Sequence, residues 1–340
     1  MKGILLVNLG SPNSTSVKDV KKYLDEFLMD GRVIDVPYVM RCLLVKGIIL
    51  NTRPKQSAEA YSKVWTEEGS PLIVISEKFT HKVKQQINAP VALAMRYGSP
   101  SIESGIKELK TQGVNQILVV PLYPQFAMAT TETITALADK IVRDQFPDIT
   151  LTHFPAFYNQ PDYIDVLAKS IQETLDKEDY DHLLFSYHGV PEKHIRNSDV
   201  TQSHCELNGA CCTTPSKAHE FCYRHQCYAT TQGVVEKLGL QPGFYSTSFQ
   251  SRLGKDPWLQ PYTDMTINDR AQNGIKKLAV VTPAFVADCL ETIEEIGMEA
   301  KEEFEENTGE LFTTIPCLND RDDWVQVVTN WLNNWLVEKK

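Results

Sequence analysis

Short apolar runs alternate with amphipathic stretches along this 340-residue chain. Most of the runs end at Gly, Pro, Ser or Asn, which is typical of buried strands. We predict strands at residues 3–8, 91–97, 116–120, 150–154, 181–187, 243–247 and 277–282. The stretches between them repeat their apolar positions at helical spacing. The pattern therefore predicts an α/β fold in which helices cover both faces of parallel sheets.

Capping residues mark several helix starts. Ser16, followed by Asp19, predicts a helix that begins at residue 17. Ser70 before Pro71 has the order of an N-cap serine and a first-turn proline, so a second helix is expected there. A third helix is expected near residues 102–111.

Two pairs of similar segments indicate that the chain contains the same half twice. LLVNLGSP (residues 5–12) is similar to LLFSYHGVP (183–191), and ILVVPLY (117–123) is similar to LAVVTPAF (278–285). Repeated halves predict two similar α/β lobes.

We expect the lobes at residues 1–160 and 161–320, and aligning Gly10 with Gly189 places Leu9 where His188 stands. The remaining segment, 321–340, carries tryptophans at helical spacing and is expected to be a helix that packs back on the lobes.

The second lobe delivers a histidine at the end of a strand. The apolar run 183–185 gives way to Ser186, Tyr187 and His188, and Pro191 prevents the strand from continuing inside a sheet. Ligands of open α/β sheets bind at the carboxyl ends of the strands, which makes His188 a candidate functional residue. A strand-end histidine satisfied by local hydrogen bonds explains the pattern equally well.

An acidic row follows the strand predicted at residues 277–282. Asp288, Glu291, Glu295 and Glu299 fall on one side of an α-helix at about 100° per residue. A solvated acidic face is the usual explanation of such a row. Here the row begins at the carboxyl end of a strand, and carboxylates together with an imidazole suit a divalent first-row metal ion.

Composition and charge exclude several classes of partner. The chain is 42% hydrophobic, with a net charge of −10 and a pI of about 5.4, which argues against binding to nucleic acid.

The chain enters its first strand without a basic or long apolar leader, so we expect a cytoplasmic protein. Asp35, Pro37, Arg41 and Lys46 interrupt the apolar window 33–50, and we favour a core or surface helix there over a lip in peripheral contact with a membrane.

Five of the eight cysteines lie between Cys205 and Cys227, whereas Cys42, Cys289 and Cys317 are dispersed. In a chain without a secretion signal, such clustering indicates a metal site more than disulfides. Cys205, Cys212, Cys222 and Cys227 have the number of thiolates needed for a 2Fe–2S cluster or a structural zinc ion, with Cys211 as the alternative to Cys212. A reduced, metal-free loop is the remaining interpretation.

Six motifs resemble signatures of the ferrochelatase family, whose members insert ferrous iron into a porphyrin. They are LVNLGSP (6–12), MRYGSPSI (95–102), LYPQFAMATT (122–131), SYHGVPEKH (186–194), QSRLGKDPWLQPYTD (250–264) and AFVADCLETIEEI (284–296). Because they cover essentially the whole chain in the family's order, the resemblance implies two Rossmann-like lobes and a lyase that completes haem synthesis.

This resemblance also implies roles for site residues. His188 and Glu291 match the family's metal-insertion residues, and we expect His188 to accept protons and Glu291 to present Fe2+, which is a substrate, although the division of these roles stays open. Asp288 and Glu295 are expected to continue an acidic path. Two pyrrole protons must leave as iron enters, which requires a base near neutral pH and an exchangeable metal ligand. Cys289 departs from the histidine that the family often has at this position.

Further residues match positions that line the family's porphyrin pocket. They are Leu9, Tyr61, Tyr123, Trp258 and Phe285, with Arg96 and Tyr97 on a polar wall near the propionates. Some family members carry a 2Fe–2S cluster, and the resemblance favours that cluster over zinc in the cysteine insert, residues 198–228.

We therefore predict a ferrochelatase that acts on protoporphyrin IX. The alternatives are a coproporphyrin III ferrochelatase, a non-catalytic two-lobed protein that binds a tetrapyrrole or an iron–sulfur centre, and a cobalt or nickel chelatase. The oligomeric state stays open.

Overall fold

A computed structural model describes residues 1–252, 254 and 256–338. Leu253 and Lys255 of the QSRLGKDPWLQPYTD motif lie outside the described residues, as do the last two residues of the chain. Two compact units make up the fold. Unit 1 comprises Met1–Leu122, Met128–Pro155 and Asn319–Lys340, and unit 2 comprises Tyr123–Ala127 and Ala156–Leu318.

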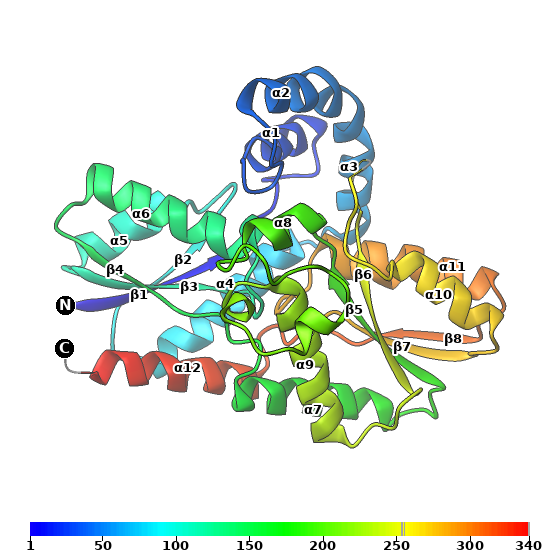
Figure 1. Ribbon diagram of the computed structural model, residues 1–340. Helices are drawn as coiled ribbons and strands as arrows, with labels where there is room; N and C mark the ends of the chain where they lie inside the picture. Colours follow the sequence, from blue (N-terminus) through cyan, green and yellow to red (C-terminus); the bar gives the residue numbers. More distant parts are fainter. Residues whose placement is uncertain (253, 255, 339–340) are drawn as a thin grey trace. The chain divides into compact units, whose positions relative to one another are not determined.

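The sheet of unit 1 is parallel, with the strand order β2-β1-β3-β4 (Figure 1). Its strands are β1 (Lys2–Asn8), β2 (Val91–Met95), β3 (Gln116–Pro121) and β4 (Thr150–His153). In the centre, Ile4 of β1 pairs with Val91 on one side and Leu118 on the other. Residues 4–7 are fully buried, because both faces of β1 are covered, and this explains the continuous apolar run.

Helices cover both faces of this sheet (Figure 1). They are α5 (Ile102–Thr111) and α6 (Thr133–Gln145), which pack together over one face, and α4 (Pro71–Gln86) and α12 (Asp322–Val337), which pack together on the other. A short π-helix, η2 (Met128–Glu132), leads into α6. Trp324 of α12 is buried and stacks on Phe79 of α4, with ring centroids 6.3 Å apart, so apolar side chains dock the last helix on unit 1.

Four helices lie between β1 and α4, and all of them except α2 contribute to a core of their own. They are α1 (Val17–Leu28), α2 (Tyr38–Cys42), the π-helix η1 (Leu43–Ile49) and α3 (Leu50–Val64). Ser16 caps α1 as predicted, because its hydroxyl accepts a hydrogen bond from the Asp19 N–H at 3.2 Å. Val45 and Ile49 pack on Leu28 inside this small core.

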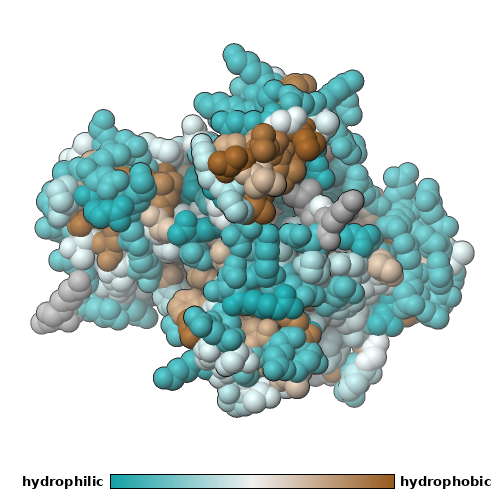
Figure 2. All heavy atoms as spheres, turned by 45° about the horizontal axis from the view of Figure 1, so that its top comes forward, coloured by the Kyte–Doolittle hydropathy of each residue, from teal (hydrophilic) through white to brown (hydrophobic). Residues whose placement is uncertain are grey.

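The outer side of this helix group carries an exposed apolar patch. Its residues are Tyr38, Val39, Met40, Leu43, Leu44 and Ile48. Figure 2 shows hydrophobic side chains gathered in the region of α2, with hydrophilic ones around them. The apolar window 33–50 therefore supplies both a buried and an exposed face. Within the part of the chain that the structure describes, no helix has the length and apolar character needed to cross a membrane.

Unit 2 repeats the sheet of unit 1. Its parallel strands are β5 (His182–His188), β6 (Tyr245–Gln250), β7 (Lys277–Val281) and β8 (Leu311–Thr314), in the order β6-β5-β7-β8. By position, β5 corresponds to β1 and β7 to β3. These are the strands that carry the two pairs of similar segments, so the prediction of two similar α/β halves is confirmed.

Equivalent glycines follow the two central strands. At Gly10, after β1, φ is +109° and an added Cβ would lie 1.9 Å from the Tyr97 carbonyl oxygen. At Gly189, after β5, an added Cβ would lie 2.7 Å from the Gln250 carbonyl oxygen. Tyr97 and Gln250 stand at the ends of the equivalent strands β2 and β6. Each half therefore requires a glycine where the central strand ends against its neighbour.

Helices also cover both faces of the second sheet. They are α10 (Thr263–Gln272), the π-helix η5 (Glu291–Ala300) and α11 (Lys301–Glu306) on one face, and α7 (Pro161–Leu175) and α9 (Tyr223–Leu238) on the other. Leu184 of β5 joins the core under the first group. Tyr187 of the same strand hydrogen-bonds Thr231 of α9 at 2.9 Å. The cysteine insert follows α8 (Glu192–Asn197) and includes the 3₁₀ turns η3 (Ala210–Cys212) and η4 (Lys217–Glu220).

Three features of unit 2 differ from the prediction. The prediction does not include β8, because this short edge strand buries only Phe312 and shows no clear apolar pattern. β6 runs three residues further than predicted, to Gln250. The prediction of an α-helix that begins at Asp288 is wrong, because the acidic segment forms a π-helix that begins at Glu291. Both helix types bury one stripe of side chains, so an apolar pattern of this length does not separate them.

Candidate active site

The imidazole of His188 is fixed at the end of β5. Its Nδ1 lies 2.6 Å from the Gly189 carbonyl oxygen. A carbonyl only accepts hydrogen bonds, so the neutral ring carries its proton on Nδ1 and leaves the Nε2 lone pair free to accept a proton. The side chain is half-buried. His188 is therefore oriented as a base.

The backbone around His188 is held from two sides. The Gly189 N–H donates to the Gln250 carbonyl at 2.7 Å, which continues the pairing of β5 with β6 beyond the strand end. The Tyr223 hydroxyl, at the start of α9, donates to the His188 carbonyl at 2.8 Å. These contacts limit movement of the strand end that carries the imidazole.

One carboxylate of η5, that of Glu295, interacts electrostatically with this histidine, and Glu291 interacts in turn with Glu295. Glu291 is the first residue of η5, and Glu295 follows on the same side. Burial and the charge of Glu291 raise the pKa of Glu295. A hydrogen bond from the Ser251 hydroxyl at 2.5 Å and the charge of His188 lower it. Burial is the largest of these effects, and the net result is a pKa above the ordinary value. Glu295 therefore lies near both His188 and Glu291.

Gln250 and Ser251 complete this group, although sequence reasoning did not single them out. Gln250 Nε2 donates to the Glu291 carbonyl at 3.2 Å and lies 3.5 Å from a Glu295 carboxyl oxygen. Ser251 has φ of +64°, and its hydroxyl faces Glu295. Both residues begin the QSRLGKDPWLQPYTD motif, which is the signal that points to them, and Gln250 pairs directly with His188 across the sheet.

The other residues of the acidic row lie on either side of this group. Asp288 precedes η5 and accepts hydrogen bonds from the Thr292 hydroxyl at 2.8 Å and from the Cys317 N–H at 3.4 Å. Glu299 is exposed. Burial, and then the charge of Glu291, raise the pKa of the Cys289 thiol, which keeps that thiol protonated. The row therefore passes from half-buried to solvent-exposed along η5.

Aromatic side chains of unit 2 flank the imidazole. The ring centroid of Phe285 is 6.2 Å from that of His188, and the centroid of Trp258 is 6.5 Å away. Both side chains are half-buried. Tyr123, the third predicted wall residue of this unit, is buried.

The predicted wall residues of unit 1 have different surroundings. Leu9 is half-buried directly after β1, at the position equivalent to His188. Tyr61 of α3 is buried and makes edge contacts with Tyr23 and Trp65. Tyr97 is fully buried, so its side chain belongs to the core of unit 1.

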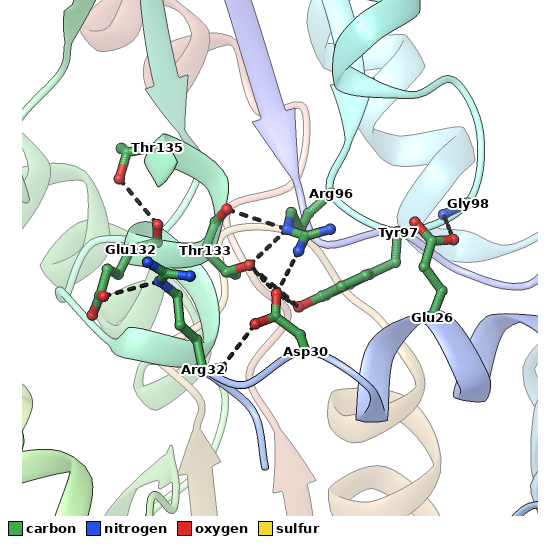
Figure 3. A network of polar contacts seen from close by, with 9 residues as sticks. All are labelled: Glu26, Asp30, Arg32, Arg96, Tyr97, Gly98, Glu132, Thr133 and Thr135. Carbon is green, nitrogen blue, oxygen red and sulfur yellow. Dashed lines mark hydrogen bonds and ion pairs between the residues drawn. The ribbon is translucent and has the colours of Figure 1, made fainter. Parts of the chain in front are cut away.

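Arg96 lies in a buried polar network at the end of β2 (Figure 3). Its guanidinium forms an ion pair with Asp30, and its Nε donates to the Thr133 hydroxyl at 2.6 Å. The Tyr97 hydroxyl donates to the same Asp30 carboxylate at 3.1 Å. Asp30 and Thr133 carry no pattern in the sequence that could have identified them.

The cysteine insert gathers buried thiols. Cys205, Cys211, Cys212 and Cys222 are at most 8% exposed. The Cys222 thiol interacts with those of Cys205 and Cys212, and Cys212 also interacts with Cys211. Cys227 is fully buried on α9, where its thiol contacts the Tyr223 hydroxyl.

Two of these sulfur atoms already accept N–H hydrogen bonds. The Arg224 guanidinium donates to Cys212 Sγ at 3.5 Å, and the His225 N–H at the start of α9 donates to Cys222 Sγ at 3.5 Å. Among the described residues, however, no three His, Cys, Asp or Glu side chains are placed to hold a metal ion. The insert thus brings thiols together without forming a finished metal site.

Comparisons with known proteins agree with these observations. The ferrochelatase family model matches residues 1–336. A ferrochelatase of Pseudomonas fluorescens (strain Pf0-1) is 49% identical over 327 residues, which are 96% of this chain and 95% of that protein. A ferrochelatase of Opitutus terrae is 44% identical over 338 residues, which are 98% of each chain.

Solved structures of two chelatases have a similar fold. SirB from Bacillus subtilis with Fe3+ has a TM-score of 0.52 at 12% identity and covers 98% of this chain and 94% of its own. The sirohydrochlorin chelatase SirB from Bacillus subtilis subspecies spizizenii in complex with cobalt has a TM-score of 0.54 at 11% identity, with the same coverage. At such identity the likeness concerns the fold alone.

Proposed function

Because this chain belongs to the ferrochelatase family, we propose that it is a lyase that inserts Fe2+ into protoporphyrin IX and releases two protons, the last step of haem synthesis. The observation that carries the proposal is the family match over residues 1–336, together with a histidine near the Glu295 carboxylate, which also interacts with Glu291. A protein that only stored a tetrapyrrole would need no base at this position.

His188 is assigned the proton-accepting role. Its Nε2 is the free acceptor of the ring, and Nδ1 is occupied by the Gly189 carbonyl. Glu291 is assigned the presentation of Fe2+, since a carboxylate binds ferrous iron less tightly than a thiolate and releases it more readily. Asp288, which precedes η5, and Glu295, within it, are proposed to continue the acidic path.

The remaining predicted contacts belong to the porphyrin. Trp258 and Phe285 flank His188 and are proposed to pack on the ring, with Tyr123, Leu9 and Tyr61 as further apolar contacts. Arg96 is proposed to face a propionate, with Tyr97 as its buried support. Packing on the ring supplies the binding energy needed to distort it toward metal insertion.

An anaerobic insertion assay tests the function. The purified chain is given Fe2+ with protoporphyrin IX or coproporphyrin III, and haem formation is followed by visible absorption. We expect faster turnover of protoporphyrin IX, and a clear preference for coproporphyrin III would overturn that choice of substrate. Porphyrin binding without any turnover would support the non-catalytic alternative, and a preference for Co2+ or Ni2+ would support a different chelatase.

We further propose that the cysteine insert binds a 2Fe–2S cluster through Cys205, Cys212, Cys222 and Cys227, with Cys211 as the alternative to Cys212. Cys205 interacts with Cys222, and Cys227 interacts with Cys212. Cys212 and Cys222 also accept N–H hydrogen bonds, so the insert has the donor chemistry of such a centre. Binding requires the thiols to rearrange, because they are not placed as metal ligands in the described structure.

The visible spectrum and metal content of anaerobically purified protein test this cluster. Iron–sulfide absorption with two iron atoms per chain supports it, and a colourless protein with one zinc atom supports the zinc alternative. Cys222→Ser should abolish the absorption, whereas Cys42→Ser, outside the insert, should not. A colourless protein without bound metal would contradict both.

We also propose a cytoplasmic enzyme that contacts membranes peripherally through the exposed apolar patch. All eight cysteines are free, which suits a reducing compartment. Residues 32–55 carry five basic residues and one acidic residue, although the chain as a whole has a net charge of −10. Apolar side chains beside basic ones favour anionic lipid.

Co-sedimentation with phosphatidylglycerol vesicles tests the membrane contact. Met40→Ser combined with Leu43→Ser should reduce binding at least about tenfold, because both side chains belong to the patch. Val200→Ser, which alters an exposed apolar side chain of unit 2, is the matched control. Equal binding by all three proteins would contradict a role of the patch.

A further inference from the structure

Asp30, two residues beyond α1, is a buried carboxylate with several donors. Its Oδ2 accepts hydrogen bonds from Arg96, from Thr133 and, at 3.1 Å, from the Tyr97 hydroxyl. Its Oδ1 accepts the Arg32 N–H at 2.8 Å. The side chain is only 8% exposed. Burial would raise the pKa of Asp30, but these hydrogen bonds and the charge of Arg96 outweigh burial and lower it, so the carboxylate stays ionised.

The contacts of Asp30 hold one edge of the Arg96 guanidinium and leave the other open. The held edge consists of Nε, which donates to Thr133, and Nη2, which donates to Asp30. Nη1 has no hydrogen-bond partner among the described residues. Because it is not one of the buried polar atoms that lack a partner, it must be accessible to solvent. Figure 3 shows this nitrogen pointing away from Asp30 and Thr133.

The open edge of the Arg96 guanidinium has the geometry needed to bind a carboxylate. Nη1 and the second N–H of Nη2 form a fork that matches the two oxygens of a carboxylate. The guanidinium cannot swing freely, because its carbon also lies 4.2 Å from the centre of the Tyr97 ring. Arg96 directly follows β2, at the carboxyl end of the sheet, where α/β folds bind ligands.

We infer that Asp30 is a positioning residue that aims the open edge of Arg96 at a carboxylate of the porphyrin substrate. This inference rests on the proposed function and adds to it a residue that touches no substrate itself. Asp30 also balances the charge of Arg96. The substrate carboxylate is therefore bound mainly by directed hydrogen bonds, with little net electrostatic attraction. Such binding is selective for orientation and allows the product to leave.

A simple tether between α1 and the sheet is the competing explanation of the same contacts. Neighbouring residues tie the same region without touching Arg96: Arg32 pairs with Glu132 at 2.9 Å, and the Gly98 N–H donates to Glu26 at 3.1 Å. If Asp30 were only a tether, breaking these contacts would have the same effect as changing Asp30. The two explanations therefore differ in what they predict for porphyrin binding.

The test measures binding of metal-free protoporphyrin IX and of its dimethyl ester, followed by porphyrin fluorescence. The ester lacks the carboxylates but keeps the ring. We expect Asp30→Asn to weaken binding of the acid about tenfold and binding of the ester less than about twofold, and Arg96→Gln to do the same. In the Arg96→Gln background, Asp30→Asn should then add little, because the residue that it positions is gone.

Glu132→Gln is the matched control, since it removes a neighbouring ion pair and leaves Arg96 unchanged. It should bind acid and ester as the unaltered protein does. If it weakens acid binding as much as Asp30→Asn, or if Asp30→Asn weakens acid and ester equally, Asp30 is a tether and the inference is wrong.

A second variant covers the case in which Asp30→Asn does not fold. Thr133→Val keeps the ion pair but removes the hydroxyl that joins Asp30 to Arg96 Nε, and it should weaken acid binding alone, about threefold. Unchanged acid binding by a folded Thr133→Val protein would then overturn the inference. Because no metal is used, an unaltered protein that binds porphyrin but never inserts iron would contradict the proposed function and leave this test intact.

Discussion

At the residue scale, single hydrogen bonds act on two groups of the site. The Gly189 carbonyl places the proton of the neutral His188 ring on Nδ1. The Ser251 hydroxyl opposes the effect of burial on Glu295. One backbone carbonyl thus orients the imidazole, whereas burial, opposed by one hydroxyl, raises the pKa of the carboxyl group.

Replacing His188 should separate catalysis from binding. We expect His188→Ala to slow iron insertion by about 10²–10⁴-fold, which is the usual contribution of a positioned base, while porphyrin affinity changes less than about threefold. Anaerobic insertion rates and porphyrin fluorescence measure the two effects. His81→Ala, on the exposed side of α4, is the control. Full turnover by His188→Ala would remove the imidazole from the mechanism.

The raised pKa of Glu295 predicts a pH-dependent stability effect. A carboxyl whose pKa is higher in the folded than in the unfolded chain destabilises the fold as pH rises through that range. Glu295→Gln should therefore raise the Tm by about 1–2 °C at pH 8 and leave it unchanged at pH 4, measured by thermal denaturation. Glu302→Gln, on the exposed side of α11, should show no such dependence. A Tm difference of equal size at both pH values would refute the explanation.

At the element scale, the sequence predicted those helices and strands whose formation depends on neighbouring residues. Apolar runs identified seven strands, and Ser16 identified the start of α1, because burial and capping act within a few residues. The π-helix η5 and the edge strand β8 were not predictable, since neither has a distinct apolar period. The Asp30 network was not predictable either, because Asp30 and Thr133 lie 103 residues apart and meet only in the folded unit.

The glycine after the central strand of unit 1 should be irreplaceable. Gly10→Ala forces a Cβ against the Tyr97 carbonyl at a positive φ, and we expect it to lower the free energy of unfolding by at least about 3 kcal/mol. Gly47→Ala is the matched control, because no atom lies within 4 Å of its added Cβ and the position is helical. It should stabilise by about 0.5–1 kcal/mol in denaturant unfolding. Equal effects of the two changes would contradict the close approach.

At the scale of the whole molecule, unit 1 is built from both ends of the chain. Lys2 of β1 donates to the carbonyls of Trp335, Leu336 and Glu338, at 2.6, 3.3 and 2.8 Å, and its charge lies 4.7 Å from the Trp335 ring centre. One lysine of the first strand therefore caps the last helix. A cation at the carboxyl end of a helix also interacts favourably with the helix dipole.

Removing this cap should loosen the end of α12. We expect Lys2→Met to cost about 1–2 kcal/mol of stability and to speed proteolysis within the last turn of α12. Thermal unfolding and limited proteolysis with mass spectrometry measure the two effects. Lys18→Met, which alters an exposed lysine of α1, should change neither. An unchanged cleavage rate in the Lys2 variant would show that the cap contributes nothing.

The division of unit 1 between the two chain ends has a consequence for synthesis on the ribosome. All of unit 2 is translated before Asn319 and the residues after it. Until then Phe79 and Phe154 lack Trp324 and Trp331, on which they stack in the finished unit. The nascent chain therefore presents an uncovered aromatic surface, of the kind that chaperones bind, until α12 has emerged. Assembly of unit 1 is completed only after the final helix has been released.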